Sequence, residues 1–123
     1  MTNSNEQASW SVPEWPAPPN VRSLITLRGG GVSRPPYASF NLATHVGDDP
    51  LAVAANRARL GAVLPGDPLW LDQVHGSAVA DADCPPGDGV APCADAVVAR
   101  RTGQVCAVMT ADCLPVLFCD RAG

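Results

Sequence analysis

The chain has 123 residues, a formal net charge of −4, and a composition that is 46% hydrophobic and 16% charged. A chain of this size forms one domain at most and buries about two-thirds of its unfolded surface. All eight basic residues are arginines and are scattered along the chain apart from one adjacent pair, which argues against a nucleic-acid partner. No apolar run approaches the ~18 residues that a membrane span needs, so we expect no membrane partner.

The N-terminus lacks the basic and apolar regions of a signal peptide, so we expect a cytoplasmic protein with reduced thiols. Its five cysteines include no C-x-x-C pair, which excludes a zinc finger or a thioredoxin motif. Cys84 and Cys93 flank a loop rich in proline and glycine. They would cross-link it only in an oxidising setting, and two free thiols are expected. Cys106 and Cys119 alternate with apolar residues, which predicts core packing.

The first twenty residues differ in composition from the rest of the chain. Residues 1–20 end in a proline-rich run, which predicts a disordered tail, and residues 21–123 are expected to form part of a single domain. Val21 to Arg28 alternates as a strand does. A glycine run at 29–31 follows, but Pro35 and Pro36 prevent a helix from starting there. The glycines therefore indicate a bend rather than a phosphate-binding loop.

The clearest helix signal lies between Pro50 and Val63. Asp48 or Asp49 provides a cap, Pro50 suits the first turn, and Leu64-Pro65-Gly66 ends the helix. The remaining body of the chain predicts strands, about six in all, and the fold class is therefore α+β. The strands expected after the helix are 69–75, 95–100, 105–109 and 116–119.

Two residues with reactive side chains stand at the ends of predicted strands. Asp112 and Cys113 interrupt an apolar run between two strands expected to be buried, which places them at the rim of a sheet, where open sheets tend to bind ligands. His75 ends the predicted strand 69–75. Taken alone, Cys113 is more often a small core residue, and a lone His at a strand end is more often structural.

Three stretches together resemble the YfiH-type laccase-domain family. These proteins were first labelled multicopper polyphenol oxidases and are now understood as zinc-dependent purine nucleoside phosphorylases with adenosine deaminase activity. The similarity runs from about Leu24 to Asp120. The stretches that carry it are Gly30–Ser33 with Tyr37, Asn41-Leu42 and His45–Asp49; Gln73-Val74-His75-Gly76; and Thr110-Ala111-Asp112-Cys113-Leu114-Pro115.

The resemblance implies that His75 and Cys113 bind a catalytic metal. Neutral imidazole and thiolate are good zinc ligands, and two histidines cannot build several copper centres, so zinc is favoured over copper. The family's third ligand is a downstream histidine absent from this chain, whose only other histidine is His45. We therefore expect the N-terminal part of a family member. Its fold would be a layered sandwich of mixed β-sheets with flanking helices, incomplete in this chain.

The same resemblance implies two reactions on a purine nucleoside. In phosphorolysis, phosphate attacks the ribose C1′ and the purine leaves; in deamination, a metal-activated water attacks C6 of adenine. Asp112 is a candidate to move a proton or orient a ligand, and capping of the turn is an equal alternative. Arg28 and Asn41 are hypotheses for substrate binding, since a guanidinium suits phosphate. The expected partners are a purine nucleoside and phosphate.

Three other functions remain open from the residues. The first is the copper polyphenol oxidase of the family's older label. The second is a cysteine hydrolase with Cys113 as nucleophile and His75 as base. The third is a fragment or partner-dependent binding module without catalysis of its own.

Overall fold

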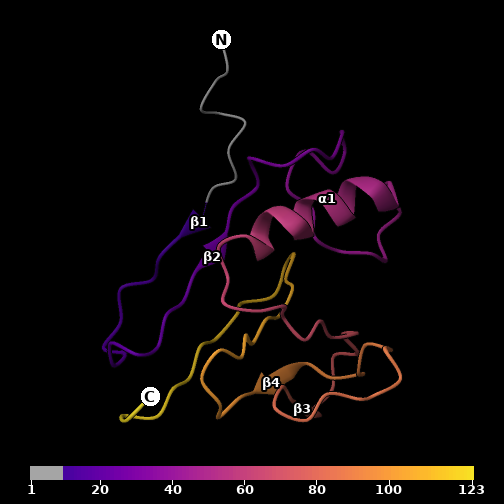
Figure 1. The fold of residues 1–123 in the computed structure, drawn as a ribbon. Helices are drawn as coiled ribbons and strands as arrows, with labels where there is room; N and C mark the ends of the chain where they lie inside the picture. The colour runs from indigo at the N-terminus through magenta and orange to yellow at the C-terminus, as the bar shows by residue number, and fades with distance from the viewer. Residues whose placement is uncertain (1–9) are drawn as a thin grey trace. The chain divides into compact units, whose positions relative to one another are not determined.

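A computed structural model describes residues 10–123, which form two compact units. The first unit contains the described residues up to Arg59 together with Val116–Gly123, and the second contains Leu60–Pro115. In chain order the elements are β1 (Trp10–Ser11), β2 (Ile25–Thr26), α1 (Pro50–Gly61), β3 (Val79–Asp81) and β4 (Ala96–Val98), as Figure 1 shows. The structure therefore combines one helix with two small sheets, in agreement with the α+β expectation.

The segment that starts at Trp10 is attached to the first unit. β1 pairs with β2 in antiparallel register, with Trp10 opposite Thr26. Trp15 donates a hydrogen bond from its indole Nε1 to the Ser23 hydroxyl over 3.1 Å. Trp10 and Ser11, expected in a disordered tail over residues 1–20, therefore form a paired strand, and the boundary between tail and domain stays a prediction. The rest of that expectation, residues 1–9, lies outside the described residues.

Helix α1 confirms the strongest local signal in the sequence. The Asp49 side chain accepts the Leu51 N–H over 3.0 Å, and its carbonyl accepts the Val53 N–H over 3.1 Å, so Asp49 is the cap. The helix ends at Gly61, two residues before the predicted end. The Val63 N–H then bonds to the carbonyl three residues earlier, as is common where helices end.

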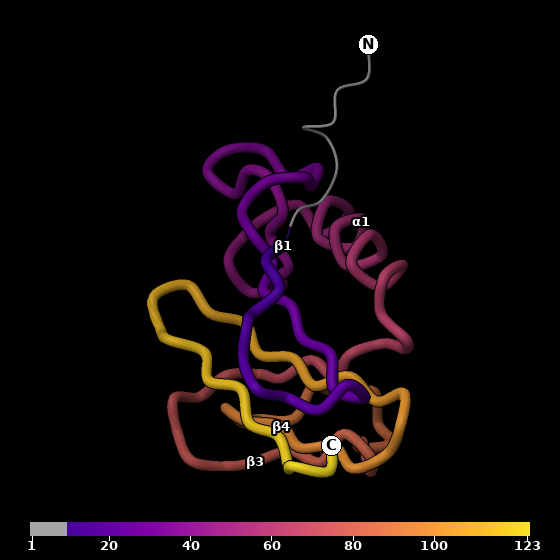
Figure 2. The backbone as a smooth tube through the Cα atoms, turned by 90° about the vertical axis from the view of Figure 1, so that its left-hand side faces the viewer, coloured from indigo at the N-terminus to yellow at the C-terminus, as the bar shows by residue number. Residues whose placement is uncertain are grey.

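A buried asparagine on α1 holds the loop that precedes the helix. Asn56 is 0% exposed. Its Oδ1 accepts the Val32 N–H over 2.9 Å, and its Nδ2 donates to the Ser33 hydroxyl over 2.9 Å and to the Asn41 carbonyl over 2.8 Å. Figure 2 shows the loop and α1 lying side by side in the first unit. The buried face of the helix therefore binds the loop through a polar side chain.

The close approach of loop and helix explains one glycine of the run at 29–31. A Cβ atom at Gly31 would overlap the Ser39 carbonyl oxygen and would lie 2.6 Å from both the Phe40 Cα and the Asn56 Oδ1 on α1. No side chain fits at that distance. Arg57 adds a bond from its Nε to the Leu42 carbonyl over 2.8 Å. Gly31 therefore packs the loop, and the chain bends at Gly30 and Gly31 as predicted.

The second unit is built on parallel pairing. β3 and β4 form a parallel pair in which Val79 lies opposite Ala96, and β4 confirms part of the predicted strand 95–100. The predicted strand 69–75 is reduced to single parallel bridges from Leu69 to Cys106 and from Asp72 to Cys93. The expectation of a continuous strand there is wrong, because the residues after Asp72 leave the pairing.

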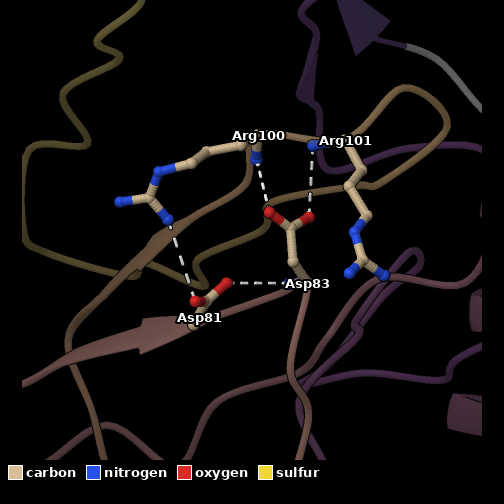
Figure 3. A network of polar contacts seen from close by, with 4 residues as sticks. All are labelled: Asp81, Asp83, Arg100 and Arg101. Carbon is tan, nitrogen blue, oxygen red and sulfur yellow. Dashed lines mark hydrogen bonds and ion pairs between the residues drawn. The ribbon is translucent and has the colours of Figure 1, made fainter.

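An aspartate after β3 fixes the chain where β4 ends (Figure 3). Asp83 accepts the Arg100 N–H over 2.8 Å and the Arg101 N–H over 3.3 Å, and its own N–H donates to the Asp81 side chain over 2.9 Å. The Arg100 guanidinium lies 3.8 Å from the Asp81 carboxylate. Because this ion pair is exposed it adds little stability, and the backbone bonds provide the constraint.

The two strands expected to be buried near the end of the chain do not form. Residues 105–109 contribute one bridge, at Cys106, and 116–119 form no strand in the described chain. Leu114 is 86% exposed and Phe118 is 89% exposed. A buried strand needs neighbours that pair with its backbone and cover its side chains, and residues 10–123 supply neither for this stretch.

The cysteines follow the same pattern. All five are free and exposed. This confirms the expected free thiols at Cys84 and Cys93. The prediction that Cys106 and Cys119 pack in a core is wrong, because the expected buried strands do not form and both side chains are exposed. Within residues 10–123, no helix is long and apolar enough to cross a membrane.

Candidate functional site

The five predicted site residues divide between the two units. His75, Asp112 and Cys113 belong to the second unit, and Arg28 and Asn41 belong to the first. The two sets are described in turn.

His75 lies in a loop that leaves the parallel pairing. Asp72 is paired with Cys93 and Val79 with Ala96, so six residues on one side span the gap that two residues span on the other. The six residues form the excursion 73–78, which contains His75. The side chain of His75 is exposed, and its φ angle is +56°. His75 therefore occupies a left-handed turn and not the end of a strand.

The carboxylate of Asp95 occupies the base of this loop. It accepts three consecutive backbone N–H groups, from Val74 over 3.1 Å, from His75 over 2.8 Å and from Gly76 over 2.7 Å. The pKa of Asp95 lies below its ordinary value, chiefly because the Gly76 N–H stabilises the charged carboxylate. Desolvation opposes this shift, while the N–H groups of His75 and Val74 and the charge of His75 also lower the pKa. The three N–H groups of the loop therefore bind one negatively charged carboxylate.

Asp112 and Cys113 lie in a bend after Met109, and both are exposed. Neither side chain has a hydrogen bond or an ion pair with another residue in the described range 10–123. The alternative in which Asp112 caps the turn therefore finds no bond to support it. The reactive groups of both residues face solvent.

The metal-binding side chains of the described residues fall short of what catalytic zinc requires. Residues 10–123 contain no group of three or more His, Cys, Asp and Glu side chains arranged to hold a metal ion. Catalytic zinc takes three protein ligands and an open position. His75 and Cys113 offer two donors of the right chemistry, but the described residues do not complete a zinc site.

Arg28 and Asn41 make contacts within the first unit. The Arg28 Nε donates to the Ala38 carbonyl over 2.9 Å. Asn41 donates from Nδ2 to the Ala43 carbonyl over 3.2 Å and to the Asp48 carboxylate over 3.1 Å, and its Oδ1 accepts the Ala43 N–H over 3.0 Å. A substrate would reach the Asn41 amide only by replacing these bonds, and the substrate-binding roles of both residues stay predictions.

Asp48 is the charged centre of that region. Its carboxylate accepts the Ser33 hydroxyl over 2.5 Å in addition to the Asn41 amide. The hydrogen bond from Ser33 is the largest cause that holds the pKa of Asp48 below its ordinary value. The bonds from Asn41 and the Asp49 N–H lower it further, and desolvation opposes the shift. Asp48 is therefore a structural anion in the loop that Asn56 also holds.

Sequence reasoning did not single out Asp95. Its partners are backbone groups of a loop about twenty residues earlier in the chain, which no local pattern reveals. Its available signals were its place as the first residue of the predicted strand 95–100 and its position, with Ala96, between the second and third stretches that carry the family resemblance.

The comparisons with known proteins agree with the motifs. Residues 22–123 match the family described as multi-copper polyphenol oxidoreductase laccase. Purine nucleoside phosphorylase PA4543 of Pseudomonas aeruginosa is 52% identical over 94% of this chain and 46% of its own length. Purine nucleoside phosphorylase YfiH of Escherichia coli is 53% identical over 91% of this chain and 46% of its own length.

A solved structure shows the same fold. The crystal structure of protein NMB0706 of Neisseria meningitidis superposes with a TM-score of 0.82 at 51% identity, over 93% of this chain and 46% of that one. The chain thus spans about half the length of the relatives that it matches. With a family match over residues 22–123 and this fold, the chain belongs to the family described as multi-copper polyphenol oxidoreductase laccase.

Proposed function

We propose that this chain is the N-terminal part of a purine nucleoside phosphorylase. The observation that carries the proposal is identity of 52–53% to proteins of that name over more than nine-tenths of the chain. In the reaction, a phosphate oxygen forms a bond to the ribose C1′ while the bond from C1′ to the purine nitrogen breaks, and the purine leaves with that electron pair. Purine nucleoside and phosphate are the proposed substrates.

The proposed roles fall on the residues that the family motifs single out. His75 and Cys113 would supply two ligands of a zinc ion, with the third from a part of the protein outside this chain. When bound, zinc would supply Lewis-acid chemistry at the site. Arg28 would bind phosphate through the guanidinium nitrogens beyond its Nε, which already bonds to the backbone. Asp112, exposed beside Cys113, would move a proton to or from the substrate.

Adenosine deaminase activity is proposed as a second activity of the same site, since the family resemblance implies both. The full layered sandwich of mixed sheets is proposed for the complete protein, in which further chain would cover the apolar residues exposed near Phe118. A cytoplasmic location stays a prediction from the N-terminal sequence.

The test extends the chain to the length of its relatives by fusing residues 1–123 to the corresponding C-terminal part of Escherichia coli YfiH. The fusion is expected to release hypoxanthine from inosine only when phosphate is present and to contain about one zinc per chain. Cys113→Ala should abolish both, and Cys119→Ala, which removes another exposed thiol, should leave both unchanged. A folded fusion without phosphate-dependent release would refute the proposal.

The same fusion separates the alternatives. A hydrolase with Cys113 as nucleophile would keep its activity in a chelator, whereas the proposed enzyme would lose it. A copper oxidase would consume oxygen with a phenol and would not need phosphate.

A further inference from the structure

The loop 73–78 is longer than the pairing around it requires. It joins Asp72, paired with Cys93, to Val79, paired with Ala96. The facing strand crosses the same gap with two residues, the second of which is Asp95. Asp95 also donates its own N–H to the Ala78 carbonyl over 3.2 Å. Asp95 therefore contacts both the beginning and the end of the excursion.

His75 has a backbone conformation that its side chain disfavours. Its φ of +56° lies in the left-handed region, which a residue other than glycine adopts only at a cost in free energy. Such a conformation persists only when its surroundings determine it. Here the three N–H groups of residues 74–76 converge on one carboxylate, at distances of 2.7–3.1 Å. Charge-assisted bonds of this kind are about twice as strong as neutral ones.

The turn decides which way the histidine side chain points. In a regular strand, His75 would share a face with Leu69 and Leu71 by simple alternation, and Leu71 is buried. The left-handed turn interrupts that alternation, and His75 is exposed. The direction of the imidazole thus depends on the bonds that hold the turn.

We propose that Asp95 is a positioning residue, which sets the direction of the His75 imidazole by gathering the three N–H groups of residues 74–76. The consequence for catalysis rests on the proposed function, in which His75 belongs to the site. The positioning itself is a property of the second unit, because the loop, Asp95 and β4 all lie in Leu60–Pro115.

Asp83 provides a matched control within the same unit. Its carboxylate also accepts consecutive backbone N–H groups, from Arg100 and Arg101, but these lie at the end of β4 (Figure 3). Asp83→Asn therefore removes a carboxylate of the same kind without touching the His75 turn. A general loss of stability would affect both variants alike, whereas loss of positioning would affect only Asp95→Asn.

The first experiment follows the imidazole ¹H–¹³C signals of His75 by NMR in the 123-residue chain, with His45 as an internal reference. In Asp95→Asn the His75 signals and the amide signals of residues 74–76 should shift, while His45 should stay in place. In Asp83→Asn the His75 signals should also stay in place. Unshifted His75 signals in folded Asp95→Asn would overturn the proposal.

A second variant guards against failure of Asp95→Asn to fold. Asp95→Glu keeps the charge and both acceptor oxygens but moves them by one methylene, so the His75 signals should still shift. Unshifted signals there would also overturn the proposal.

The second experiment measures phosphorolysis by the fusion. Asp95→Asn should lower kcat by on the order of a hundredfold and leave the KM for phosphate unchanged, because a catalytic group is misplaced while phosphate binding is intact. Asp83→Asn should leave kcat unchanged. An unchanged kcat in Asp95→Asn would refute the catalytic consequence. A parent fusion without activity would refute the proposed function and leave the NMR result to decide on the positioning.

Discussion

Two loops of this protein are each organised around one side chain, but the two side chains differ in kind. In the first unit, the neutral amide of Asn56 is completely buried and bonds to both N–H and C=O groups of the loop. In the second unit, the carboxylate of Asp95 is half-buried and bonds only to N–H groups. An amide donates and accepts, whereas a carboxylate only accepts.

The difference indicates what each loop is for. A buried amide with all its bonds made locks the loop into the core, because breaking any bond strands a polar group away from water. A carboxylate that collects neighbouring N–H groups instead bends the chain sharply and leaves the side chains of the turn in solvent. The first arrangement stabilises the fold, and the second presents His75.

The largest expected effect comes from Asn56→Leu. This change leaves the Val32 N–H and the Asn41 carbonyl without their partner, and each unsatisfied buried group costs about 1–3 kcal/mol. We expect a loss of ~3 kcal/mol in the free energy of unfolding, measured by urea denaturation. Asn20→Ala, which removes one exposed bond of 3.4 Å, should change it by less than about 0.5 kcal/mol. Equal effects of the two changes would remove the contrast between the loops.

Gly31→Ala should lower the free energy of unfolding by about 2 kcal/mol. The added methyl group overlaps backbone atoms of Ser39 and Phe40 and pushes the loop away from the helix. Gly61→Ala is the control, since a Cβ there meets nothing within 4 Å and alanine favours a helix. Thermal unfolding of both variants measures the difference. If Gly31→Ala left the stability of the protein unchanged, the loop would be held less closely than described.

A smaller effect is expected in acid. Because the pKa of Asp48 is lowered from its ordinary 3.8 in the folded protein, its stabilisation is present above that value and is lost as the pH falls through the lower folded pKa. Asp48→Asn should therefore flatten the fall of stability below about pH 4 while the stability near neutral pH decreases. Urea denaturation across this pH range tests the sign, and a steeper fall in the variant would contradict it.

The smallest effect on stability is expected at the end of the chain. Phe118 is 89% exposed, so Phe118→Ser should change the unfolding free energy by less than about 0.5 kcal/mol. It should nevertheless reduce the fluorescence of a dye that binds apolar surface. A large destabilisation would mean that Phe118 is covered in solution.

The parts of the structure that the sequence predicted well have local causes. Helix α1 begins where Asp49 and Pro50 supply a cap and a first turn, and β4 lies in an apolar run between Asp95 and Arg100. The predicted strands 105–109 and 116–119 failed because strands depend on neighbours distant in the sequence. The family motifs predict His75 and Cys113 as site residues, which stays a prediction, but the turn at His75 depends on Asp95, which no spacing rule connects to it.

The mismatch of six residues against two across the His75 loop shows which residues the strand pairing does not need. If the loop were shortened until both sides matched, Asp72 and Val79 would fall into one continuous parallel register with Cys93 and Ala96. The sheet would gain regularity, and the protein would lose its histidine turn. A deletion variant with an unchanged or raised melting temperature would show that the second unit folds without this excursion. Its extra residues would then be dispensable for strand pairing, and their role would be to expose the His75 side chain.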